Sequence, residues 1–211
     1  MPPCIKVNPM RISELFHSVQ GEGHLTGKPM FFIRAQGCSV KCPIRDDCDQ
    51  PESLGFKGGT DYTPQALAQL ALHAVGPHGW VSITGGEPLD HADFDEVVAA
   101  CRRAGLFVNV QTSGLRHLNA PCDWCTVSPK APAAELQLRF AHELKVVYTG
   151  QSNEELRAYF EQFSAFNYYL QPFYRAGEAN TAATLEKVYE LNRLGMQWEF
   201  TAQWHKYLGV R

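Results

Sequence analysis

The sequence predicts an α/β protein whose parallel strands close toward a barrel that is only partly complete. Short runs rich in β-branched and aromatic residues alternate along the chain with amphipathic segments of helical period. This alternation is typical of parallel strands joined by right-handed helical crossovers. Because only about four helices accompany roughly six or seven strands, a complete eightfold barrel has too few helices, and a trimmed TIM-like barrel is the better interpretation.

Seven short runs are expected to be strands. Each is rich in β-branched or aromatic residues and ends in small or turn-forming residues. The runs cover residues 30–37, 80–86, 106–113, 123–129, 142–150, 167–173 and 196–203. A sheet of parallel strands carries its site at the carboxyl ends of the strands, which is where the sequences TGGEP, QTSG and SPK fall.

Four amphipathic segments are expected to be helices. The first follows Thr63-Pro64, the third opens at a Ser152-x-x-Glu155 capping box, and the fourth covers roughly 181–194. The apolar positions at helical spacing are Leu67, Leu70 and Ala71 in the first helix and Phe94, Val97, Val98 and Cys101 in the second. These positions should face the sheet.

Composition and length indicate an ordinary globular protein. The chain has 211 residues, a net charge of −3 and 45% hydrophobic residues, which suits a single domain covering 1–211. The weakly acidic balance argues against a nucleic-acid partner, since phosphate neutralisation needs a basic face. No apolar run is long enough for a bilayer, and no signal peptide is recognisable, so a cytoplasmic protein without a membrane partner is expected.

Three cysteines within a short loop are the first chemical signal. Cys38, Cys42 and Cys48 follow the pattern C-x3-C-x5-C. A zinc site would require a fourth ligand nearby, and a disulfide would leave one thiol over. An iron–sulfur cluster held by three thiolates leaves one iron free for a further ligand. The spacing alone does not decide between zinc and an iron–sulfur cluster.

The second signal is the sequence ITGGEP, which follows a strand and precedes a helix. Gly85 and Gly86 allow a close approach of the backbone, and Glu87 places a carboxylate there. By itself this segment is equally consistent with a plain strand-to-helix turn. Together with three clustered cysteines, it resembles the radical S-adenosylmethionine (SAM) superfamily, in which the free iron of a [4Fe–4S] cluster binds SAM.

The flanking segments narrow this resemblance. HSVQGEG, FIRAQGC, TGGEP, QTSG, SPK, LKVVY, LQP and QWHKYLGVR occur in this order over nearly the whole chain. The series is similar to the 7-carboxy-7-deazaguanine synthase family of queuosine biosynthesis. The resemblance implies that Cys38, Cys42 and Cys48 hold a [4Fe–4S] cluster. It also implies that SAM is bound by Gly85, Gly86, Glu87, Ser113, Ser128, Pro129, Lys130, Gln171 and Pro172.

The same resemblance implies a pterin substrate, bound by Gln20, Gly21, Glu22, Arg34, Thr84, His205 and Arg211. Gln20 and Glu22 offer an amide and a carboxylate for the edge of a pterin ring, although a solvated turn would explain them too. Arg34 lies in an apolar strand, where an unpaired charge is costly. A substrate carboxylate is a good bidentate partner for it, and an internal ion pair is the alternative.

Two departures distinguish this chain from the family pattern, which is usually C-x3-C-x2-C with an aromatic residue before the third cysteine. Here the second gap is five residues long, and Asp47 precedes Cys48. The family continues with Asp-Thr or Asp-Ser, whose hydroxyl binds Mg²⁺, whereas this chain has Asp49-Gln50. An amide oxygen can also ligate a hard cation, so Gln50 is the candidate ligand.

The resemblance implies that the protein is a lyase that contracts the ring of 6-carboxy-5,6,7,8-tetrahydropterin with loss of ammonia. Flavodoxin or ferredoxin would supply electrons, and a homodimer is expected. No side chain is expected to act as the catalytic acid or base. Two alternatives have different functions: a small activating enzyme for glycyl-radical proteins, and a non-catalytic module binding zinc or an iron–sulfur cluster.

The remaining cysteines are expected to be structural. Cys101 lies on the apolar face of its helix and Cys125 in a β-run, where thiols act as small hydrophobic groups. Cys122-x-x-Cys125 also permits a redox interpretation. Cys4 is near the N-terminus, with no role expected.

Overall fold

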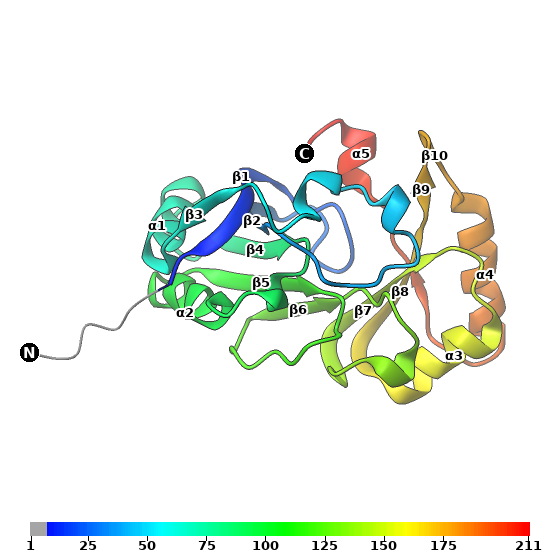
Figure 1. Ribbon diagram of the computed structural model, residues 1–211. Coiled ribbons are helices and arrows are strands. Elements are labelled where there is room, and N and C mark those ends of the chain that lie inside the picture. The colour runs from blue at the N-terminus through cyan, green and yellow to red at the C-terminus, as the bar shows by residue number, and fades with distance from the viewer. Residues whose placement is uncertain (1–7) are drawn as a thin grey trace, which may run out of the picture.

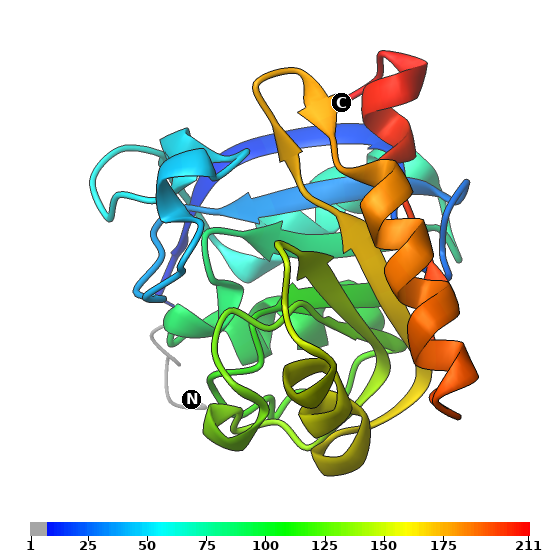
Figure 2. The same cartoon turned by 90° about the vertical axis from the view of Figure 1, so that its right-hand side faces the viewer.

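A computed structural model describes residues 8–211, and Cys4 lies outside these described residues. Its main feature is a nine-stranded sheet in the order β11-β8-β7-β6-β5-β4-β2-β1-β3. The seven strands from β11 to β2 run parallel, and β1 and β3 extend the sheet in antiparallel pairing. Figures 1 and 2 show this sheet curving into an open, partial barrel. The predicted fold class is therefore confirmed.

All seven predicted strands are present. They are β2 (Pro29–Ala35), β4 (Trp80–Gly85), β5 (Phe107–Thr112), β6 (Trp124–Val127), β7 (Phe140–Tyr148), β8 (Ser164–Pro172) and β11 (Glu199–Phe200). The sequence patterns missed β1 (Met10–Val19), β3 (Thr60–Tyr62) and the hairpin of β9 (Tyr174–Arg175) and β10 (Glu178–Ala179). These four do not belong to strand–helix–strand units, so the alternation that predicts the parallel strands does not reveal them.

The four predicted helices are also present, as α1 (Pro64–Val75), α2 (Phe94–Arg103), α3 (Asn153–Gln162) and α4 (Thr181–Arg193). Thr63 caps α1, and both halves of the Ser152–Glu155 capping box are formed. A fifth helix, α5 (Trp204–Leu208), was missed because its five residues bury no side chain and give no apolar period. None of these helices, within residues 8–211, is long and apolar enough to cross a membrane.

The helices cover the outer face of the sheet and complete two hydrophobic clusters (Figure 1). The first cluster joins α1 and α2 to β2, β4 and β5, and it contains Cys101 with no exposed surface. The second joins α3 and α4 to β6, β7 and β8, and it contains Cys125. The buried positions predicted for these two cysteines are thus confirmed.

One predicted core position is wrong. Leu70 of α1 is 42% exposed, whereas Leu67 and Ala71 are fully buried. The buried stripe of α1 runs through Pro64, Leu67, Ala68 and Ala71, and Leu70 lies beside it on the helix surface.

Candidate active site

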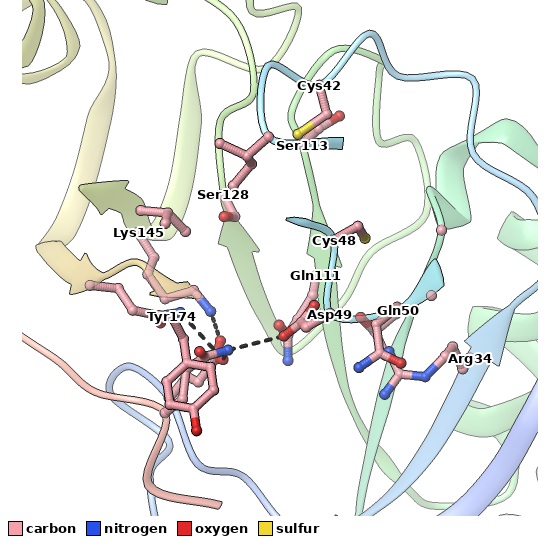
Figure 3. Close-up of a pocket in the computed structure, with 18 of the residues that line it drawn as sticks. Arg34, Cys42, Cys48, Asp49, Gln50, Gln111, Ser113, Ser128, Lys145 and Tyr174 are labelled. Atoms are coloured by element: carbon pink, nitrogen blue, oxygen red, sulfur yellow. Dashed lines mark hydrogen bonds and ion pairs between the residues drawn. The ribbon is translucent and has the colours of Figure 1, made fainter. Parts of the chain in front are cut away.

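A cavity of about 280 Å³ opens at the carboxyl ends of the parallel strands (Figure 3). The lining includes Cys38, Cys42, Cys48 and Gln50 from the loop after β2. It also includes Gly85, Gly86, Glu87, Ser113, Ser128, Lys130, Gln171 and Pro172, which were expected to bind SAM. The expected substrate residues Gln20, Gly21, Glu22, Arg34, Thr84, His205 and Arg211 line it as well. Pro129 is the one predicted residue outside the lining, and it is buried.

The cysteine loop is held at the mouth of the cavity by the backbone. The N–H of Gly37 donates to the Ser53 carbonyl at 2.8 Å, and the N–H of Cys38 donates to the Leu54 carbonyl at 3.1 Å. Partial burial raises the pKa of the Cys38 and Cys48 thiols. Within residues 8–211, no three His, Cys, Asp or Glu side chains gather closely enough to hold a single metal ion. The loop offers three separate thiols, which suits a cluster larger than one ion.

The glycines of the TGGEP segment are required by a close backbone approach. A Cβ at Gly86 would lie 2.1 Å from the Gly37 carbonyl oxygen, and one at Gly85 would lie 2.2 Å from the Ala35 nitrogen. Gly85 also has a φ of +132°, which side chains rarely adopt. These two residues therefore pack the end of β4 against the exit of β2, directly beside Cys38.

Glu87 is almost fully buried and joins two strand ends. Its carboxylate accepts hydrogen bonds from Thr112 Oγ1 at 2.7 Å, Ser113 N at 2.9 Å and Ser113 Oγ at 2.5 Å. A buried carboxylate requires such partners, and here they lie in the QTSG segment after β5. Glu87 thus fixes the relative position of the TGGEP and QTSG segments.

The SPK segment after β6 supplies a compact polar pair. Lys130 Nζ donates to Ser128 Oγ at 2.7 Å and to the Ser128 carbonyl at 3.0 Å. Burial lowers the pKa of Lys130, although the nearby acidic groups and thiols oppose this shift. The ammonium group therefore lies at the cavity wall with room to contact an anionic group.

The QGEG segment forms the part of the cavity wall that contacts β7 and β8. Glu22 contacts Lys145 Nζ of β7, and it accepts hydrogen bonds from Gln203 Nε2 at 2.9 Å and Gln171 Nε2 at 3.4 Å. Lys145 is buried, which lowers its pKa to about 7. A Cβ at Gly21 would lie 2.3 Å from His205 Nδ1, so glycine is needed where the C-terminal segment packs on this turn.

A buried glutamate beneath the QGEG segment holds the segment in place. Glu143 of β7 accepts hydrogen bonds from the His24 N–H and from Thr126 Oγ1, both at 2.8 Å. Burial raises the pKa of Glu143. A Cβ at Gly23 would lie 2.4 Å from its carboxylate, which explains the second glycine of QGEG.

Arg34 and Arg211 share one carboxylate at the rim of the cavity. Arg34 Nε lies 2.5 Å from Glu14 Oε1, and Arg211 contacts the other oxygen of Glu14. The internal ion pair considered for Arg34 is therefore formed through Nε. Its two terminal nitrogens make no other hydrogen bond to the described part of the chain, so they can still contact a ligand.

Four polar residues of this site were not singled out from the sequence: Glu14, Glu143, Lys145 and Gln203. Lys145 has the feature that identified Arg34, because it is a cation inside the apolar strand run LKVVY. The other three have no local signal, since their partners lie far away along the chain.

The partial barrel and the three-cysteine loop at its mouth define the chain as a radical SAM enzyme in fold and site. No family model matches the sequence. The chain is 38% identical to 7-carboxy-7-deazaguanine synthase of Synechocystis, covering 95% of this chain and 93% of the relative. It is 34% identical to the enzyme of the same name from Bacteroides thetaiotaomicron, covering 95% and 98%. The chain belongs to the 7-carboxy-7-deazaguanine synthase family.

Solved structures support the fold. The crystal structure of QueE from Escherichia coli matches with a TM-score of 0.72 at 23% identity, covering 92% of this chain and 93% of that one. SuiB of Streptococcus suis bound to S-adenosylmethionine matches with a TM-score of 0.54 at 17% identity, covering 79% and 48%. The family implies that SAM and a [4Fe–4S] cluster are the cofactors.

Proposed function

We propose that this chain converts 6-carboxy-5,6,7,8-tetrahydropterin to 7-carboxy-7-deazaguanine with loss of ammonia, as a radical SAM lyase. Two relatives that bear the name of this enzyme match the chain over 93% and 98% of their own length. The observation that carries the proposal is the convergence of the expected residues: all but Pro129 line one cavity. A cavity of about 280 Å³ is close to the size of small-molecule sites, which favours a small substrate.

Three features of the cavity fit the cofactors of the family. The half-buried thiols of Cys38, Cys42 and Cys48 are the ligand type that an iron–sulfur cluster requires. The cluster and SAM, when bound, supply the radical that starts the reaction. We assign Ser113, Ser128 and Lys130 to contacts with SAM. Gln171 Oε1 is buried without a hydrogen-bond partner among residues 8–211, which leaves an acceptor available for the ligand.

We assign the substrate to the wall formed by the QGEG segment and β2. Glu22, held by Lys145 and two amides, presents a carboxylate to the N–H groups of a pterin edge. Arg34 presents its terminal nitrogens to the substrate carboxylate, while Glu14 fixes its orientation. Gln20, Gly21, Thr84, His205 and Arg211 complete this wall. The residues orient the substrate and exclude water from the reacting atoms.

We propose that this enzyme depends less on Mg²⁺ than relatives with Thr or Ser after the Cys-Asp pair. Gln50 lines the cavity, and its NH₂ group can donate directly to the substrate carboxylate. Such a contact replaces an ion that would otherwise bridge a short hydroxyl and that carboxylate.

The remaining parts of the proposal concern the surroundings of the enzyme. We propose a single domain covering 1–211, a homodimer, a cytoplasmic location and a flavodoxin or ferredoxin as electron donor. The reaction needs one low-potential electron to start, and no group within residues 8–211 can supply it without such a donor. The net charge of −3 disfavours nucleic acid as a partner.

One experiment tests the reaction directly. The protein is purified without oxygen, supplied with iron and sulfide, and incubated with carboxytetrahydropterin, SAM and a low-potential reductant. Formation of 7-carboxy-7-deazaguanine is expected, with roughly four irons per chain, as one [4Fe–4S] cluster requires. A chain with one zinc and no absorbance would indicate the binding module. A loaded cluster that cleaves SAM without acting on the pterin would favour an activating enzyme for a glycyl-radical protein.

A further inference from the structure

A polar network connects the substrate wall of the cavity to the loop that carries the third cysteine. It runs from Lys145 through Glu22 and Gln203 to Asp49, which directly follows Cys48. Figure 3 shows dashed contacts that lead from Lys145 to Asp49 through the side chains between them. The two ends come from β7 and the cysteine loop, which are nearly one hundred residues apart in the sequence.

Gln203 is the residue that the two halves of this network share. Its Nε2 donates to Glu22 Oε1 at 2.9 Å and to Asp49 Oδ2 at 3.1 Å. Its Oε1 accepts from Lys206 Nζ at 2.8 Å, and Lys206 Nζ lies 3.5 Å from Asp49 Oδ2. Both the NH₂ group and the oxygen of the amide therefore have hydrogen-bond partners, which fixes the direction in which the NH₂ group points.

The backbone around Gln203 is fixed to the substrate wall. The Trp204 N–H donates to the Gly21 carbonyl at 2.9 Å, and His205 packs directly on Gly21. Lys206 also lies 4.3 Å from the ring centre of Tyr174 in the β9–β10 hairpin. Helix α5 and this hairpin lie side by side in both overall views (Figures 1 and 2). A shift of Glu22 or Gly21 therefore moves Gln203 as well.

A second contact beside Cys48 is weaker. Arg175 Nε lies 3.0 Å from Asp47 Oδ1, but its side chain is 69% exposed. Solvent-exposed ion pairs contribute little because water screens the charges. Lys206 is 23% exposed and Asp49 is 47% exposed, but Asp49 has two partners, Gln203 and Lys206, so these contacts are the stronger connection to the loop.

From these contacts we infer that Gln203 is a positioning residue that couples substrate binding to the cysteine loop. Substrate binding at Glu22 orders the carboxylate that Gln203 contacts, and Gln203 in turn holds Asp49 and the adjacent Cys48. Cys42 and Cys48 are separated by five residues, and the contacts of Gln203 and Lys206 with Asp49 attach the end of this loop to the C-terminal segment. The inference rests on the proposed function, since it takes the pterin to bind at Glu22.

Coupling of this kind should also change how firmly the loop holds the cluster, so it can be measured there. The loaded enzyme is mixed without oxygen with an excess of iron chelator, and the rate of iron loss is followed by absorbance. The rate is measured with and without 6-carboxy-5,6,7,8-tetrahydropterin, in the absence of SAM and reductant, so that no turnover occurs. We expect the substrate to slow iron loss by about fivefold, the scale that one hydrogen bond supports.

The variant Gln203→Leu removes the amide but keeps its approximate size. In this variant the rate of iron loss with the substrate should equal the rate without it, because the link between Glu22 and Asp49 is lost. Gln203→Glu should also remove protection, because it places a carboxylate between Glu22 and Asp49. Lys206→Met should reduce protection partly. Gln162→Leu, on the exposed end of α3, is the matched control and should keep full protection.

The outcomes are distinguishable. Full protection in both Gln203→Leu and Gln203→Glu overturns the inference, as does a parent enzyme whose cluster the substrate does not protect. Equal loss of protection in Gln162→Leu also overturns it, because the effect would then not depend on Gln203. If the parent enzyme forms no 7-carboxy-7-deazaguanine, the proposed function fails instead. The melting temperature of each variant separates misfolding from loss of coupling, and the Lys206→Met result remains decisive if Gln203→Leu does not fold.

Discussion

The thiols of Cys38, Cys42 and Cys48 lie half-buried beside the cavity, whereas those of Cys101 and Cys125 lie in the hydrophobic core. The first three belong to a loop with two short 3-10 turns and little apolar packing. Cys101 and Cys125 each contact one of the two core clusters, and burial raises the pKa of Cys101 to about 12. The same side chain is therefore accessible from the cavity in one region and is a small hydrophobic group in the other.

The glutamates near the cavity differ in exposure. The side chain of Glu22 is 14% exposed, whereas Glu87 and Glu143 are 1% and 2% exposed. All three accept hydrogen bonds, so exposure, and not hydrogen-bond satisfaction, distinguishes Glu22 as the carboxylate most open to a ligand. Glu87 organises the strand ends, and its contact with SAM stays a prediction.

The largest expected effect is on iron content and activity when a cysteine of the loop is replaced, compared with a cysteine that packs against the core. Cys48→Ala should abolish the absorbance of the cluster and all activity, because a cluster ligand is lost. Cys122→Ala should retain roughly four irons per chain, the content of one [4Fe–4S] cluster. Iron and sulfide analysis with a product assay measures both. Loss of iron from Cys122→Ala would break the comparison, because Cys122 packs against the core and not against the cavity.

The next largest effect is expected on the alkylation rates of core and loop thiols in the cluster-free protein. At pH 8, Cys101 should react with an alkylating reagent at least about a hundredfold more slowly than Cys42, because the thiolate is the reactive form and a pKa of about 12 leaves little of it. Mass spectrometry of peptides assigns each modified cysteine. In urea the difference should vanish. Equal rates in the folded protein would contradict the burial of Cys101.

A smaller effect, on substrate affinity, is expected at Arg34. This residue lines the cavity and also forms an ion pair with Glu14. Arg34→Lys keeps the charge but loses the planar fork, so it cannot contact both Glu14 and the substrate carboxylate in the same way. Substrate affinity should fall about tenfold while SAM affinity is unchanged. Arg157→Lys, in an exposed pair on α3, is the control. Weakened SAM binding instead would place Arg34 on the cofactor side.

The smallest effect is expected when Mg²⁺ is removed from the parent enzyme, in which Gln50 lines the cavity. Turnover should change by less than about twofold between added Mg²⁺ and excess chelator, because an amide donor can take the place of the ion. Gln50→Thr should make turnover depend on Mg²⁺, as a short hydroxyl leaves room for the ion. A large loss of rate in chelator for the parent enzyme would show that Gln50 or Asp49 holds the metal.

The strand and helix positions of the parallel part of the fold could be predicted from the sequence because their signals are local. Periodicity located β2 and α2, and a capping box located α3, within a few residues. The antiparallel strand β1 and the short helix α5 had no such signal, and both contribute to the cavity wall. The assignment of Cys101 and Cys125 to the core also followed from local apolar patterns.

The sequence by itself determined the order of the parallel strands and of the four longer helices, the three-cysteine loop, and the set of residues at the strand ends, because each depends on spacing along the chain. Only the tertiary structure decided which polar residues are already satisfied and which face the cavity. The pairs Arg34–Glu14, Glu22–Lys145 and Gln203–Asp49 join residues 20 to 154 positions apart. Hydrogen bonds act over about 3 Å in space, irrespective of separation in sequence, so no local pattern could have identified these partners.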